Sequence, residues 1–165
     1  MRTPGRHRPP RARGSIAVEC ALLLPIFIML LTVMLFAGRI FWHYTVAEKA
    51  AHDAARFLAT ASLKEMRTPG GGTEVPIVAL AKRIVQEEIE ELNPGGFVVP
   101  SILCYVGPAA NPYWEECFGI DTPRKIRVRV TVAISDPILE SATSWLNNGE
   151  PIVLRAVMAT DYVGN

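Results

Sequence analysis

The chain has 165 residues and a net charge of +1, which leaves room for one ordinary domain, or for a membrane segment followed by a small domain. Its charges are unevenly distributed, because five arginines and no acidic residue precede Gly14. The rest of the chain holds 12 basic and 16 acidic residues, so it is mildly acidic and offers no basic surface for nucleic acid, which we exclude as a partner. The five are Arg2, Arg6, Arg8, Arg11 and Arg13.

A long apolar run follows the basic leader, which we place at residues 1–14. Residues 20–38 carry no charge, and no polar stripe interrupts the run between Cys20 and Leu31. As a helix with a rise of about 1.5 Å per residue, the run would be about 28 Å long, close to the thickness of the hydrocarbon core of a bilayer. We therefore predict a transmembrane helix over 15–38, with its charge-free span from Cys20 to Gly38.

The charges on the two sides of this span predict its orientation. The arginines precede it, whereas the far side begins with Arg39 and continues with the balanced pair Glu48 and Lys49. Because positive charge is retained in the cytoplasm, we expect a cytoplasmic N-terminus and an extracytoplasmic C-terminal part. The run is longer than the apolar core of a signal peptide and no clear cleavage site ends it, so we expect the span to remain in the mature protein.

Glu19 stands at the start of the apolar run, where a carboxylate is costly unless it has a partner. Cleavage after Gly14 would create an α-amino group on Ser15, four residues and therefore one helical turn from Glu19. In an assembly, the same carboxylate could instead neutralise the amino terminus of a neighbouring subunit and fix the register between them. The alternative interpretation is that Glu19 lies at the cytoplasmic interface and Gly14 is an ordinary flexible residue.

A basic leader that ends in glycine, followed by a glutamate five positions on and a hydrophobic helix, resembles the type IV prepilin processing motif. The longer pattern over 13–25 resembles more specifically the TadE-like family of tight-adherence (Tad/Flp) pilus systems, as does the alanine-rich stretch 50–59. Cys20 departs from the pattern, because an aromatic residue commonly follows the glutamate. The resemblance extends over about residues 13–61 and is faint beyond them.

The resemblance implies cleavage between Gly14 and Ser15 by a prepilin peptidase, and a role as a minor pilin or pseudopilin. The partners it implies are the prepilin peptidase, other pilins and inner-membrane pilus assembly proteins, together with membrane lipid. The implied location is the bacterial inner (cytoplasmic) membrane, as a single-pass protein that is incorporated in a pilus or stays in the membrane.

The helix is expected to continue beyond the membrane as an extension over 39–66, because this segment contains neither Gly nor Pro. Small and apolar residues recur along it at spacings of three and four, which predicts one apolar seam for another helix, or for the protein's own domain. The glycines and proline of 68–72 then predict a flexible joint. The seam consists of Ile40, Tyr44, Ala47, Ala51, Ala54, Leu58 and Ala61.

Residues 67–165 are expected to form an extracytoplasmic α+β domain. A second amphipathic helix begins near Thr73 and Pro76 and ends at 93–96, with Ile77, Leu80, Ala81, Ile84 and Ile89 on its apolar face. Beyond this helix, the period of the apolar residues changes to two, which is typical of strands. We predict a strand region over 97–106 interrupted by Pro100, a clear half-buried strand over 126–134, a short helix from 136 to 146 and a last strand over 152–162. Helices followed by a mainly antiparallel sheet give a pilin-like layout.

Cys104 and Cys117 flank a turn-rich segment and could be joined across a hairpin, if the domain lies in an oxidising compartment. The alternative is two unpaired thiols in a reducing cytosol. Cys20 lies within the apolar run, so three cysteines do not make a disulfide scaffold.

The motifs of catalysis and of cofactor binding are missing from the sequence. His7, His43 and His52 lack the spacing of a zinc site, the glycines at 70–72 are not followed by the Lys-Ser/Thr pair of a phosphate loop, and no Gly-x-Ser-x-Gly elbow occurs. We therefore expect no enzyme, no cofactor, no metal and no small-molecule substrate. The second hypothesis for function is an uncleaved signal-anchored envelope protein with an extracytoplasmic binding or sensing domain.

Overall fold

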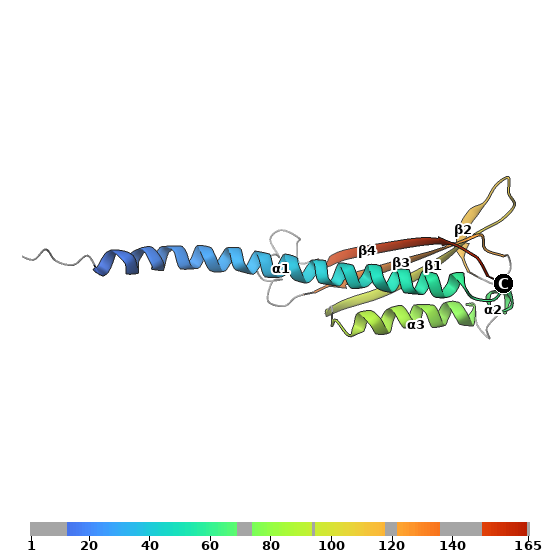
Figure 1. Cartoon of the computed structure of the whole chain (residues 1–165), viewed down its shortest axis with the longest axis horizontal. Helices are drawn as coiled ribbons and strands as arrows, with labels where there is room; N and C mark the ends of the chain where they lie inside the picture. The colour runs from blue at the N-terminus through green and yellow to red at the C-terminus, as the bar shows by residue number, and fades with distance from the viewer. Residues whose placement is uncertain (1–12, 69–73, 94, 118–121, 136–149, 165) are drawn as a thin grey trace, which may run out of the picture. The chain divides into compact units, whose positions relative to one another are not determined.

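A computed structural model describes residues 13–68, 74–93, 95–117, 122–135 and 150–164, with side chains from residue 17 onward. Among these residues, the elements in chain order are three helices and four strands, which gives the predicted α+β class (Figure 1). Contacts within the chain divide it into two units, Met1–Arg39 and Ile40–Asn165. Helix α1, Arg13–Ala59, contributes to both units and is continuous through Pro25.

The helical extension ends earlier than the sequence led us to expect. Instead of one helix to Met66, α1 ends at Ala59 and a short helix α2 follows at Leu63–Arg67. The Thr60 hydroxyl donates to the carbonyl oxygen of Phe57 at 3.1 Å, which competes with the helical pattern at this turn. Ser62 then accepts a hydrogen bond from the backbone N–H of Glu65, and the Glu65 carboxylate accepts from that of Ser62. This capping box starts α2 as a separate helix.

Helix α3, Pro76–Glu90, confirms the second helix, and its buried face includes Ala81 and Ile89 as expected but is rotated relative to the predicted face. Its buried residues are Val78, Ala81, Val85 and Ile89. Of the residues we expected on that face, Ile77 and Ile84 are only half-buried and Leu80 is 48 % exposed. Apolar side chains occupy two overlapping stripes of this helix. The stripe that is buried is the one that packs against the rest of the core.

The sheet has four antiparallel strands in the order β2-β1-β3-β4. The predicted strand at 126–134 is confirmed as β3, and the last strand as β4, which ends one residue before Tyr162. In the middle of the sheet, β3 pairs with β1 on one side and with β4 on the other. The bounds are β1 Gly95–Val106, β2 Tyr113–Glu116, β3 Lys125–Ile134 and β4 Ile152–Asp161.

Pro100 does not interrupt β1, contrary to the expectation from the sequence. It is buried and pairs with Val130 of β3 inside a continuous register. Strand β2 reaches only from Leu103 to Val106 of β1, so the other edge of β1 is unpaired at Pro100 among the described residues. Proline is tolerated there because no ladder hydrogen bond is required from its nitrogen.

The core of the second unit lies between one face of the sheet and the helices, which run along the strands (Figure 1). Every second residue of β3 from Ile126 to Ile134 is buried, and the alanines of α1 pack in the same cluster. The expected seam is therefore used inside the protein's own domain from Ala47 onward, where small side chains allow close packing. The buried alanines of α1 are Ala47, Ala50, Ala51, Ala54, Ala55 and Ala59.

Three expected features lie outside the described residues. These are the leader up to residue 12, the joint at 69–72, and the short helix from 136 to 146 with the turn at 147–149.

Candidate processing and anchoring site

Gly14, Ser15 and Glu19 lie in the first turns of α1, which begins at Arg13. Ser15 and Glu19 are four residues apart in this helix, which is about one turn, as expected from the sequence. The side chain of Glu19 is exposed. A carboxylate in this place is accessible to a cation from its own chain or from another copy.

The span 20–38 also lies in α1. Phe36 is half-buried, whereas the large apolar side chains from Leu22 to Leu35 are exposed. Their exposure ranges from 44 % at Leu31 to 71 % at Met29. Within the described residues, one helix is long and apolar enough to cross a membrane, and its most apolar window has a mean hydropathy of 2.7 with none of it buried. Exposed apolar surface of this extent is unfavourable in water and indicates a partner or a lipid environment.

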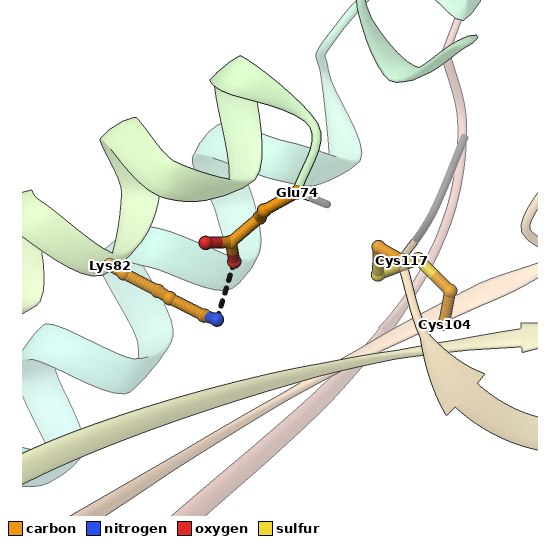
Figure 2. The surroundings of a disulfide bond; sticks show 4 residues. All are labelled: Glu74, Lys82, Cys104 and Cys117. Carbon is orange, nitrogen blue, oxygen red and sulfur yellow. Dashed lines mark ion pairs between the residues drawn. A yellow bond between two sulfur atoms is a disulfide. The ribbon is translucent and has the colours of Figure 1, made fainter. Parts of the chain in front are cut away.

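Cys104 and Cys117 are joined by a disulfide in the structure, with their Cα atoms 5.2 Å apart (Figure 2). Cys104 lies in β1, opposite Glu115 of β2, and Cys117 follows the end of β2. The bond closes a loop of 13 residues, which is worth about 3 kcal/mol when loop entropy alone is considered. The disulfide therefore stabilises the short hairpin β1–β2, in which only four residue pairs join the two strands.

The start of α3 and the end of β4 are fixed by polar contacts. Glu74, just before α3, forms an ion pair with Lys82 two turns along the helix (Figure 2). The Tyr162 hydroxyl donates to the carbonyl oxygen of Ala61 at 2.9 Å and so ties the chain after β4 to the turn after α1. Burial, and secondarily the carboxylate of Glu65, raises the pKa of Tyr162. We call the second unit, Ile40–Asn165, the outer unit. These contacts stabilise it but make no catalytic arrangement.

The sequence did not reveal a cluster on the face of the sheet that points away from the helices. The Arg127 guanidinium lies over the Trp114 ring, 3.9 Å from its centroid, and the Trp114 and Tyr105 rings are 4.9 Å apart. The three residues come from β3, β2 and β1. Alternation alone could place Arg127 and Tyr105 on exposed faces, but only the strand order and register bring them together.

No metal site is formed by the described residues, because no group of three or more His, Cys, Asp or Glu side chains is placed to hold an ion. Of the three histidines, His43 is buried in the second unit and His52 is exposed beside Asp53. His7 lies outside the described residues.

The site therefore consists of a glycine, a glutamate and an apolar helix in a fixed order. Residues 14–56 match the model of the TadE-like protein family. This segment is TadE-like. The match begins at Gly14, includes Glu19 and the whole span, and ends in the alanine-rich part of α1. It confirms the resemblance seen in the sequence.

The match makes residues 14–56 similar to a family that is related to Tad pili and is not a family of enzymes. Together with the single apolar helix, the match suggests a membrane-anchored protein. No curated protein and no solved structure matches the chain.

Proposed function

We propose that the chain is a minor pilin or pseudopilin of a Tad/Flp-type pilus assembly system. A prepilin peptidase removes residues 1–14, and the mature protein begins at Ser15. Before assembly, the protein is anchored in the bacterial inner membrane by residues 15–38, with the leader in the cytoplasm and residues 39–165 outside.

The observation that carries this proposal is the position of Glu19 in a TadE-like helix. The carboxylate lies one turn after Ser15 and immediately before the charge-free span. A new amino terminus on Ser15 supplies the cation that such a carboxylate needs near a membrane. In a neighbouring copy, the same pairing fixes the axial position of one helix against another, which is the assembly role we assign to Glu19.

The proposed partners follow from this arrangement. The prepilin peptidase acts on the bond between Gly14 and Ser15, and other pilins and inner-membrane assembly proteins contact the exposed apolar helix. The disulfide between Cys104 and Cys117 supports an oxidising location for the outer unit, since such bonds persist outside the reducing cytosol.

The decisive experiment is the mass of the mature chain. When the protein is produced with a prepilin peptidase, intact-mass measurement and N-terminal sequencing should reveal a species that starts at Ser15. Gly14→Leu is the matched control and should remain uncleaved, because a large side chain blocks the position before the cut. If only chains that start at Met1 accumulate while the peptidase processes another pilin in the same cells, the chain is an uncleaved signal-anchored protein.

The role of the carboxylate is tested separately with Glu19→Ala. This change should leave insertion into the membrane intact and impair pilus assembly, since the register contact is lost. Glu48→Ala, which removes an exposed carboxylate farther along α1, should assemble normally. Normal assembly with Glu19→Ala would reject the pairing.

A further inference from the structure

The sheet of the outer unit has one face covered by helices and an opposite, more open face, although Ala133 at one end of that face is fully buried. We call the open face the outer face. Three arginines lie on it, together with the apolar side chains of Val99, Val153 and Val157, which are 50 %, 44 % and 55 % exposed. The arginines are Arg127 and Arg129 of β3 and Arg155 of β4.

The register of the strands shows how close these charges are. Arg127 and Arg129 are two residues apart on the same face of β3. Because Thr131 pairs with Arg155 and Arg129 pairs with Val157, Arg129 and Arg155 are diagonal neighbours. Such neighbours are about 7–8 Å apart, so like charges here repel one another.

The described carboxylates of the outer face are Glu116 of β2 and Asp161 of β4, and the strand register places neither of them opposite Arg129 or Arg155. Arg127 stacks on Trp114, while Asp161 is 3.3 Å from Lys125 in an exposed ion pair. Neither Arg129 nor Arg155, both exposed, forms an ion pair with a described carboxylate. An apolar surface with exposed arginines and a neighbouring Trp has the composition of a protein interface that binds an acidic partner.

An acidic surface of this kind exists on the same chain, on the solvent side of α3. Glu87 and Glu90 are exposed there, and Glu91 follows at the end of the helix. Only Glu87 has a described cation nearby, Arg83 at 2.9 Å. The last turn of α3 contains no basic residue, so the negative end of the helix dipole adds to the charge of the glutamates instead of offsetting it.

The two surfaces cannot meet within one copy. The buried residues of α3 face the core between the helix and the sheet, so its glutamates and the outer face lie on opposite sides of the outer unit. We propose that the outer face of one copy binds the acidic side of α3 in a second copy. Because the two surfaces differ and lie on opposite sides, the contact is head-to-tail and repeats from copy to copy instead of closing as a dimer.

This contact depends on the fold of the outer unit and not on removal of the leader. An uncleaved chain would make the contact as well, so the test of the contact and the test of the proposed processing have independent outcomes.

A photo-crosslinking amino acid in place of Val157, next to Arg129 in the register, tests the contact in the full chain in native membranes. Irradiation should give an adduct of two copies, and peptide mapping should place the second copy's attachment within 76–91. An adduct to lipid, to a different protein or to the same strand of another copy overturns the proposal, as does the absence of any adduct.

Charge reversal provides the second test. Arg129→Glu with Arg155→Glu should lower the adduct yield about tenfold or more, because carboxylates would then face carboxylates. A co-expressed second copy with Glu87→Arg and Glu90→Arg should restore it. The matched control, Lys64→Glu with Arg124→Glu, makes the same change in net charge at exposed positions outside both surfaces and should have little effect. Equal yields for the reversed and control variants would reject a charged head-to-tail contact.

Discussion

Ser62 and Glu65 hold the point where the long helix ends and the rest of the outer unit begins. The Ser62 hydroxyl donates to the Glu65 carboxylate at 2.7 Å, and the backbone N–H of Ser62 donates to it at 2.9 Å. These two hydrogen bonds lower the pKa of Glu65, because they favour the charged carboxylate. The turn they stabilise also carries the Ala61 carbonyl, to which Tyr162 donates. One pair of side chains thus fixes both α2 and the end of the chain.

Ser62→Ala should raise the pKa of Glu65 toward its ordinary value and destabilise the outer unit by about 1 kcal/mol, the usual cost of a lost N-cap. The sign of the pH dependence follows from the lowered pKa. Glu65 contributes stability above its unfolded pKa, and this contribution is lost as the pH falls through the folded pKa. NMR titration of the Glu65 carboxyl group and thermal melting in mild acid measure both effects. An unchanged Glu65 pKa in Ser62→Ala would contradict the assignment.

At the scale of elements, the C-terminal half of α1 depends on small side chains. Ala50 and Ala54 are fully buried among β-strand residues and Leu58. Ala54→Leu should destabilise the outer unit by about 1–3 kcal/mol, because a well-packed core has no space for the added carbons. His52→Leu places the same side chain on the exposed side of the same helix and should have a small effect. Thermal melting of the full chain in detergent measures the difference, and equal melting temperatures would contradict the packing.

The sequence predicted the type of most described elements, and periodicity explains why. The alternation from Ile126 to Ile134 marks β3 clearly, because one face of the strand is buried. The end of α1 was missed although the pattern Ser62-x-x-Glu65 was readable as a helix start. The buried face of α3 and the continuity of β1 through Pro100 depend on which elements are neighbours. Such information resides in the tertiary structure and not in any one segment.

The features of the candidate site also differ in whether a local sequence pattern or the tertiary structure determines them. The order of Gly14, Ser15, Glu19 and the apolar run is local, so it could be recognised directly from the sequence. The cluster of Arg127, Trp114 and Tyr105 depends on three strands that are neighbours in the sheet, and no local pattern predicts it.

At the scale of the whole molecule, the basic leader and the disulfide both bear on the side of the membrane that the outer unit occupies. If residues 39–165 are outside the cytoplasm, Cys104 and Cys117 should resist alkylation unless a reductant is added. Cys20 is free and exposed in the structure, so the measurement requires Cys20→Ser in every variant. The fraction of chains labelled at Cys104 and Cys117 then reports the fraction that faces the reducing cytosol.

Replacement of the five leader arginines by serine should increase that labelled fraction, because Arg39 and Lys49 would then form the more basic side of the span. Replacement by lysine preserves the charge and should leave both cysteines protected. If the serine variant remains protected like the lysine variant, the leader does not set the orientation. If the unaltered leader already gives full labelling without reductant, the outer unit lies in the cytosol, and a pilus subunit with an external domain is ruled out, because charge, disulfide and location must agree in one topology.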